Sequence, residues 1–179
     1  MASILGTTLI EINSVAEEVS PPQRRRGRGR ELMVDTSLLR AELLKRDLTG
    51  AVVSGHLLPE VLGKREVEFV AVLRCEPLEL KKRLLSRGYG NDKVIENVEA
   101  ELIGVVLDAA VRAFGEARVH EYDTTHATPH AVAEQIAKDY GSGAPQGRPW
   151  IDWTLGYDSS TKLRLLLLSA AESTGPAST

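Results

Sequence analysis

Residues 73–101 read LRCEPLELKKRLLSRGYGNDKVIENVEAE, an apolar strand end followed by a basic helix, a Gly-Tyr-Gly turn and an acidic helix start. An apolar strand ends near Cys75, and Pro77 then opens a basic helix, because proline fits the first turn of a helix. That helix ends where Gly88 follows Arg87. A second helix begins at Asp92, and its apolar spacing continues without a break to Gly115. The stretch therefore predicts a helical hairpin directly after a strand, with a long second helix.

The segments around the hairpin alternate between strand and helix patterns. Short β-branched runs predict strands at residues 8–13, 51–55, 67–75 and 118–125. Helical spacing follows the first run, with Ser14 as a capping candidate, and the N-terminus is expected to enter its strand abruptly. Further helices are predicted from Asp35 or Thr36 and from Pro129 to about Lys138. Such alternation is typical of an α/β domain with a largely parallel sheet.

Composition favours one compact domain in a reducing compartment. The chain has 179 residues and a formal charge of −3, which argues against a protein that coats nucleic acid without sequence preference. Its single cysteine, Cys75, excludes an internal disulfide and a multi-cysteine zinc site, so we expect a cytoplasmic protein. No apolar run approaches the roughly 18 to 20 residues that span a bilayer, and we expect no membrane partner.

Two regions break the regular pattern. PPQRRRGRGR, residues 21–30, predicts a loop, because its prolines and glycines disfavour helix and strand. After Tyr140 the composition becomes linker-like and then gives IDWTLGY, where Trp150 and Trp153 are expected to pack back onto the domain. The tail, residues 158–179, carries a leucine run that predicts a short helix with a frayed end.

The hairpin sequence RLLSRGYGNDKVIENVEAE resembles the lid of the adenylate kinase isoenzyme 6 family, the small archaeal and eukaryotic nucleotide kinases that also act in small ribosomal subunit maturation. Other segments resemble the family in the same order: LIEINSVAEE, VDTSLLR, VVSGHLLPE, VAVLRCEPLELKKRL, VHEYDTT and IDWTLGY. The resemblance covers roughly residues 5–157. It implies a P-loop nucleoside monophosphate kinase fold, a parallel sheet with helices on both faces.

The resemblance also divides the chain. Residues 1–157 would form the kinase-like domain, with a monophosphate-binding-like region at 14–50 and a lid at 87–98, and residues 158–179 would form the tail. The family's first strand, its glycine-rich phosphate loop and its first helix would precede Gly6. No GxxxxGK[ST] occurs in the chain. The family's first strand is central, so we expect either a start codon placed too far downstream or a shortened relative whose gap is otherwise covered.

Two basic residues of the hairpin are candidates for nucleotide contact. Arg87 matches the lid arginine that contacts ATP in the family, and Arg83 lies one helical turn earlier on the same face. Arginines serve phosphoryl transfer by stabilising the charge that spreads over the transferred group. The alternative is that both are solvated helix arginines.

His56 follows a strand end, the place where open α/β sheets bind ligands. It resembles the family's active-site histidine, and the alternative is a hydrogen-bonded turn residue. Ser54 stands where the family commonly has a carboxylate that helps to organise Mg²⁺, and serine supplies no charge. We therefore predict no protein metal site, although the resemblance implies ATP with Mg²⁺.

The region resembling the monophosphate-binding segment contains Asp35, Arg28 and Arg30. An arginine there could hold an acceptor phosphate bidentately. The same arginine-rich stretch could instead contact RNA through phosphates, or be a solvated loop. These alternatives stay open.

The resemblance implies an enzyme of the adenylate kinase type, which transfers phosphate from ATP to AMP or another nucleoside monophosphate, with ATPase activity. It also implies a link to small-subunit maturation, with a platform ribosomal protein and rRNA as partners. The alternative is a non-catalytic relative that serves as a ribosomal-protein or RNA-binding assembly module.

Overall fold

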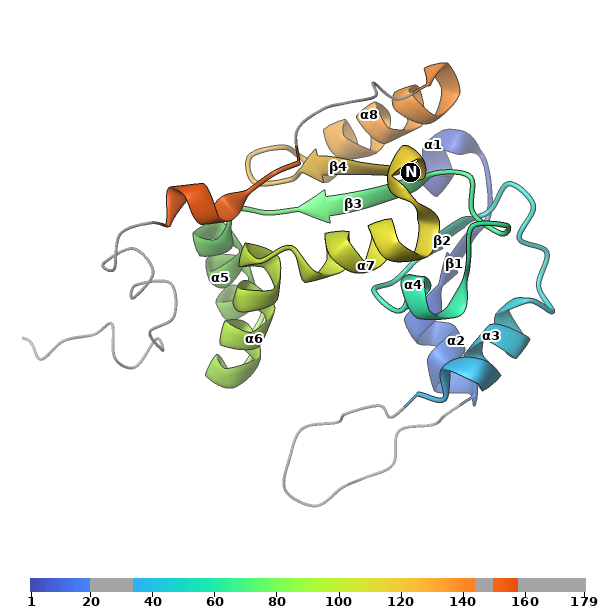
Figure 1. The fold of residues 1–179 in the computed structure, drawn as a ribbon, viewed down its shortest axis with the longest axis horizontal. Coiled ribbons are helices and arrows are strands. Elements are labelled where there is room, and N and C mark those ends of the chain that lie inside the picture. The colour runs from blue at the N-terminus through green and yellow to red at the C-terminus, as the bar shows by residue number, and fades with distance from the viewer. Residues whose placement is uncertain (20–33, 144–149, 158–179) are drawn as a thin grey trace, which may run out of the picture.

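A computed structural model describes residues 1–19, 34–143 and 150–157 (Figure 1). The elements alternate between helix and strand, which confirms the α/β class. In chain order they are α1 (Ala2–Leu5), β1 (Leu9–Glu11), α2 (Ile12–Val19), α3 (Thr36–Leu43), β2 (Val52–Ser54), α4 (Leu58–Val61), β3 (Val70–Arg74), α5 (Pro77–Ser86), α6 (Asn91–Leu102), α7 (Val105–Phe114), η1 (Glu116–Arg118), β4 (Val119–Asp123), α8 (Pro129–Ser142) and η2 (Trp153–Gly156).

The strands form two parallel pairs. β1 pairs with β2, placing Leu9 beside Val52, and β3 pairs with β4, placing Val70 beside Val119. Parallel pairing is as predicted. Within the described ranges no ladder joins β2 to β3, which is where the family resemblance places its first strand.

Helices cover both faces of the β3–β4 pair, with α8 on one side and α7 on the other (Figure 1). Alternation along the strands explains this arrangement, because successive side chains point to opposite faces. Tyr122 packs with Val132 and Ile136 of α8, whereas Val72 packs with Ala110 and Phe114 of α7. The predicted cover on both faces is therefore confirmed for this pair.

One apolar cluster links the two strand pairs. It takes side chains from β1, α2, α3, α4, β3, α7 and β4, and its buried members are Ile10, Ile12, Val15, Ala16, Leu39, Leu43, Val61, Leu62, Val72, Ala110, Phe114 and Val119. The pairs thus share a core although they share no backbone ladder. This core fixes the positions of both sets of strand ends.

The predicted long second helix is wrong, because the chain breaks between α6 and α7. Gly104 adopts the left-handed conformation at φ 71°, and the N–H of Ile103 bonds the carbonyl of Glu99 to end α6. Glycine reaches this conformation without the steric cost that a Cβ would add. Apolar spacing alone does not reveal such a break, because it continues on both sides.

The N-terminus also differs from the sequence prediction. Ala2–Leu5 forms a helical turn that Gly6 ends at φ 65°, so the chain does not enter β1 abruptly. Ser14 lies inside α2 and does not cap it, because helix starts at Ile12 directly after the strand.

Other predicted boundaries are confirmed. Asp35 caps α3, Pro77 opens α5, and Gly88 follows its end at φ 78°. The helix from Pro129 runs to Ser142, slightly beyond its predicted end. In the described part of the chain no helix has the length and apolarity needed to cross a membrane.

Candidate functional site

The carboxyl end of β2 is open and carries His56. Ser54 and His56 are both exposed, and the side chain of His56 has no hydrogen-bond partner among the described residues. The turn that holds it is weakly bonded, with the Leu58 N–H donating to the Gly55 carbonyl at 3.4 Å. The structure therefore leaves the imidazole free to meet a ligand.

Gly55 is what lets the backbone pass over α2 at this point. Its φ is 149°, and a Cβ built on it would lie 2.4 Å from Cγ2 of Ile12, which is fully buried. Atoms cannot approach that closely without displacement, so only glycine fits. The exposed pair Ser54 and His56 thus stands directly above the apolar core.

Arg87 lies at the turn between α5 and α6, the turn at the tip of the α5–α6 hairpin. Its backbone N–H donates to the carbonyls of Arg83 at 3.2 Å and Leu84 at 3.1 Å, which fixes its position as the C-cap of α5. Its side chain is exposed and forms no ion pair with any described carboxylate. Arg87 is therefore a cation held on an ordered turn and available to an anion.

Arg83 is engaged within the protein. Its Nη2 donates to the carbonyls of Thr124 at 3.1 Å and Thr125 at 2.6 Å, and its Nε donates to Glu79 Oε1 at 3.0 Å. The guanidinium thus ties α5 to the end of β4. It is not the solvated helix arginine that the alternative interpretation expected, and a nucleotide contact by Arg83 stays a prediction.

Asp35 has a structural partner for its carboxylate. Its Oδ1 accepts from the N–H of Ser37 at 2.9 Å and of Leu38 at 3.2 Å, which is the geometry of a helix N-cap. Arg28 and Arg30 lie outside the described residues. Nucleotide contact by these three residues therefore remains a prediction.

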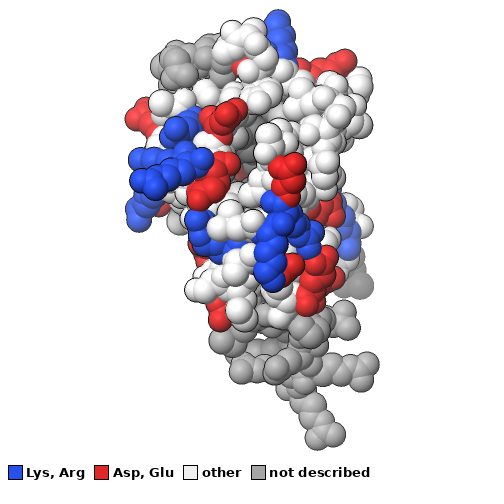
Figure 2. All heavy atoms as spheres, turned by 90° about the vertical axis from the view of Figure 1, so that its right-hand side faces the viewer, with Lys and Arg blue, Asp and Glu red and all other residues white. Residues whose placement is uncertain are grey.

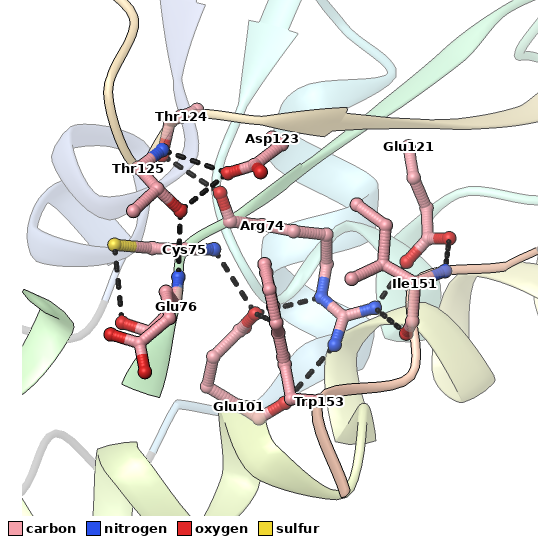
Figure 3. A network of polar contacts seen from close by, with 10 residues as sticks. All are labelled: Arg74, Cys75, Glu76, Glu101, Glu121, Asp123, Thr124, Thr125, Ile151 and Trp153. Atoms are coloured by element: carbon pink, nitrogen blue, oxygen red, sulfur yellow. Dashed lines mark hydrogen bonds and ion pairs between the residues drawn. The ribbon is translucent and has the colours of Figure 1, made fainter. Parts of the chain in front are cut away.

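A buried ion network lies at the carboxyl end of β3 (Figure 3). Arg74 is 2% exposed; its Nε contacts Glu101 Oε1 at 2.8 Å, and its Nη1 pairs with Glu121. Its backbone carbonyl accepts from both the N–H and the hydroxyl of Thr124, each at 2.8 Å. Arg74 therefore joins β3, β4 and the last turn of α6.

Sequence reasoning missed this network. An arginine closing the apolar run VAVLRC was a usable signal, since a cation at a buried strand end requires a carboxylate partner. The partners could not be identified in advance, because Glu101 and Glu121 lie far along the chain and look like ordinary helix and strand carboxylates.

Cys75 is buried beside the network. Its backbone N–H donates to Glu101 Oε1 at 3.1 Å, and burial raises the pKa of its thiol. A raised pKa keeps sulfur in the thiol form at neutral pH, and the thiolate is the reactive species. Cys75 is therefore a packing residue.

The described residues fit ATP and Mg²⁺ only in part. Arg87 can meet a phosphate, but the chain has no GxxxxGK[ST] loop whose N–H groups would hold the β- and γ-phosphates. In residues 1–19, 34–143 and 150–157 no three His, Cys, Asp or Glu side chains come together as a metal site. No step through the metal follows from these residues.

The candidate residues fall on two separate parts of the fold. Arg83 and Arg87 share the α5–α6 hairpin at the ends of β3 and β4, whereas His56 lies beyond β2. No hydrogen bond connects His56 with either arginine in the described part of the chain. A parallel α/β fold that carries an arginine-bearing helical hairpin at its strand ends defines a protein of the P-loop nucleoside monophosphate kinase-like class.

Known proteins narrow this class to a family. No protein-family model matches the chain. Proteins named "Putative adenylate kinase" are similar to the chain. That of Natronomonas pharaonis is 38% identical over 132 residues, which cover 72% of this chain and 75% of the Natronomonas protein. The Thermococcus kodakarensis protein is 38% identical over 130 residues, 72% and 70% of the two chains. That of Methanothermobacter thermautotrophicus is 43% identical over 109 residues, 59% and 61%. The chain belongs to this archaeal adenylate kinase-like family.

Proposed function

We propose that the chain is an adenylate kinase-type enzyme that transfers the γ-phosphoryl group of ATP to AMP or a similar nucleoside monophosphate. ATP hydrolysis and a role in small ribosomal subunit maturation, with a platform ribosomal protein and rRNA as partners, belong to the same proposal. Kinship with the archaeal proteins named "Putative adenylate kinase" supports the transfer activity.

The exposed guanidinium of Arg87 is the observation that carries the proposal. Phosphoryl transfer needs positive charge placed where negative charge spreads in the transition state. Arg87 supplies such a charge from an ordered turn, and no described carboxylate neutralises it. Its neighbour Arg83 differs, because two backbone carbonyls and Glu79 already occupy its donors.

The remaining candidates have subordinate roles in this proposal. His56 meets the reacting phosphates or an attacking water from the β2 side, since it is exposed and unpaired among the described residues. Arg28 or Arg30 holds the acceptor phosphate, and Asp35, which also caps α3, contributes to binding the same nucleotide. ATP would bring Mg²⁺, which neutralises phosphate charge when bound; Ser54 offers it no charged ligand.

The test compares two proteins: the 179 residues as printed, and the same chain with any in-frame residues that the gene encodes upstream of Met1. Transfer from ATP to AMP is followed in a coupled assay. In the protein that shows transfer, Arg87→Ala should lower kcat/KM about tenfold or more, because arginines at transferring phosphates stabilise the transition state strongly.

Arg112→Ala is the matched control. Arg112 is an arginine on α7 that is 79% exposed and already paired with Asp108 at 2.9 Å, so its loss should leave kinetics unchanged. Unchanged kinetics in Arg87→Ala would exclude the proposed role.

A second candidate function is a non-catalytic assembly module that binds a ribosomal protein or RNA. The printed residues contain no GxxxxGK[ST] sequence, and this function would need none. The face shown in Figure 2 is not the uniformly basic surface that would further support RNA binding, because lysine and arginine lie next to aspartate and glutamate there. Ion pairs such as Arg40 with Glu66 and Lys45 with Glu42 show the same mixing.

Calorimetric titration with ATP tests whether the printed chain itself binds nucleotide. For the 179 residues as printed we expect no saturable ATP binding at physiological salt, since exposed cations without a phosphate loop are screened over about 8 Å. Stoichiometric, Mg²⁺-dependent binding in the micromolar range would contradict this expectation and would favour the kinase for the printed chain itself.

A further inference from the structure

Residues 151–157, here called the strap, lie against the α5–α6 hairpin and contribute to its core. Tyr157 is 8% exposed and packs with the buried side chains Leu84, Val94 and Val98, which come from α5 and α6. The partly buried side chains Leu78, Leu80, Leu85 and Leu102 pack against the same cluster. The hairpin core is therefore completed by a residue from a distant part of the chain.

The hydroxyl of Tyr157 holds the first turn of α5. It accepts from the N–H of Leu78 at 3.2 Å and pairs with the Glu76 carboxylate. The other oxygen of Glu76 accepts from the N–H of Glu79 at 2.9 Å and caps the same helix. The strap thus fastens the point where the hairpin leaves β3.

Trp153 holds the last turn of α6. Its indole Nε1 donates to Glu101 Oε1 at 2.8 Å, and this oxygen also receives Arg74 Nε and the Cys75 N–H (Figure 3). An indole that donates to a buried carboxylate forms one of the stronger kinds of hydrogen bond. The point where the hairpin returns to the domain is therefore fastened as well.

The strap is itself anchored on β4. The Ile151 N–H donates to Glu121 Oε2 at 2.7 Å, and its carbonyl accepts from Arg74 Nη1 at 3.3 Å. Glu121 is a β4 residue that pairs with Arg74, so the strap connects the hairpin to the β3–β4 pair through buried charge.

We propose that the strap fixes the orientation of the α5–α6 hairpin, and hence of Arg87, relative to β3 and β4. Trp153 and Tyr157 are then positioning residues that act through the hairpin. Two isolated helices of this length are marginal in water, so their arrangement depends on the tertiary contacts at their ends. The part of the proposal that concerns Arg87 and catalysis rests on the proposed kinase function.

The experiment uses the two tryptophans as a matched pair in the 179-residue protein without nucleotide. Trp153→Phe keeps an aromatic ring and removes the donor to Glu101, whereas Trp150→Phe changes a tryptophan that is 38% exposed three residues earlier. Hydrogen exchange is measured on peptides from α6. We expect exchange in its last turn to quicken about tenfold in Trp153→Phe and to stay unchanged in Trp150→Phe.

Tyr157→Phe gives a second variant that does not depend on Trp153→Phe folding. It keeps the ring in the hairpin core and removes the hydroxyl, so exchange in the first turn of α5 should quicken severalfold while α8 stays protected. Equal exchange of the hairpin in wild type, Trp153→Phe and Tyr157→Phe would overturn the proposal.

Kinetics test the link to Arg87. In the protein that shows transfer, Trp153→Phe should lower kcat severalfold and leave the KM for AMP within about twofold, since a displaced cation weakens the transition state more than substrate binding. A change confined to the thermal midpoint would overturn the positioning role. Absence of transfer in wild type would defeat only the proposed function, because the exchange measurements need no activity.

Discussion

At the carboxyl end of β3 the chain buries a cation between two carboxylates, whereas at the carboxyl end of β2 it exposes a serine and a histidine above an apolar core. At the first place Arg74 is 2% exposed and its partners Glu101 and Glu121 are 12% and 5% exposed. At the second, Gly55 lies directly on Ile12, and Ser54 and His56 point into solvent. Both are carboxyl ends of parallel strands.

A position at a strand end therefore does not by itself make a residue available to a ligand. The β3–β4 end has its polar groups paired within the protein, so it anchors the hairpin. The β1–β2 end keeps its polar groups unpaired among the described residues, so it can meet a ligand. Stability should therefore be sensitive to polar changes at the first end and to volume changes at the second.

Arg74→Met should give the largest loss of stability. Removing the cation leaves Glu101 and Glu121 buried without their partner, which costs about 3 to 5 kcal/mol in comparable buried pairs. Urea unfolding measures the change. Arg112→Met removes an exposed arginine of α7 and should alter stability by less than about 0.5 kcal/mol. Equal losses in the two variants would mean that the buried ion network contributes no more to stability than an exposed ion pair.

Gly55→Ala should come next. The added methyl would meet Cγ2 of Ile12 at 2.4 Å and would also disfavour the positive φ, so we expect a loss of about 1 to 3 kcal/mol. Gly90→Ala is the control, since a Cβ there meets nothing within 4 Å and φ is −67°. Thermal or urea unfolding measures the loss of stability. Unchanged stability of Gly55→Ala would show that Ile12 can move to make room for the added methyl group.

A smaller, pH-dependent effect is expected at Glu66. Hydrogen bonds from the Arg40 side chain and the Gly63 N–H hold the pKa of its carboxyl below its usual range. A carboxyl whose pKa is lower in the folded protein stabilises it above the unfolded pKa of about 4.3 and loses this contribution as pH falls through the folded pKa.

Glu66→Gln should therefore destabilise the protein at pH 7 and differ progressively less from wild type below about pH 4. Unfolding by urea at both pH values provides the comparison. Glu68→Gln, at an exposed position two residues later, serves as control. If the free energy of unfolding differed between Glu66→Gln and wild type by the same amount at all pH values, the effect would come from altered packing or hydrogen bonding and not from the loss of charge.

His56→Ala should change stability least, by no more than about 0.5 kcal/mol, because the exposed imidazole has no described partner. Any loss of transfer activity in this variant would then reflect a functional contact. A loss of stability comparable to that of Gly55→Ala would instead identify His56 as a turn residue that holds the β2 end together.

Much of the fold could be predicted from sequence, because strands and helices here follow apolar spacing and clear end signals. Pro77, Gly88 and Asp35 marked their helix ends correctly. The break at Gly104 could not be predicted, since the same glycine inside a continuous apolar pattern is compatible with an unbroken helix. Arg74 Nη2 bonds the Glu101 carbonyl at 3.1 Å, three residues before that glycine, and such a contact with a distant residue is not visible in the local sequence.

The candidate site was predictable where motifs are local. The resemblance located Arg87 at a turn, and the turn is present with its side chain exposed. The engagement of Arg83 with Thr124 and Thr125 was not predictable, because those carbonyls lie 41 and 42 residues away. Sequence spacing predicts which side chains are neighbours on one helix. It does not predict which carbonyls of a distant segment a long side chain will reach.

The place of Tyr157 in the hairpin core also has a consequence for biosynthesis. Its hydroxyl bonds to Glu76, 81 residues earlier, so a ribosome must finish nearly the whole domain before the hairpin acquires its last core residue. Until then α5 and α6 would leave the exit tunnel with apolar faces exposed, which favours chaperone binding or aggregation. Nascent chains stalled before residue 150 should be cleaved by protease within α6. Chains that hold all 179 residues outside the exit tunnel should resist cleavage.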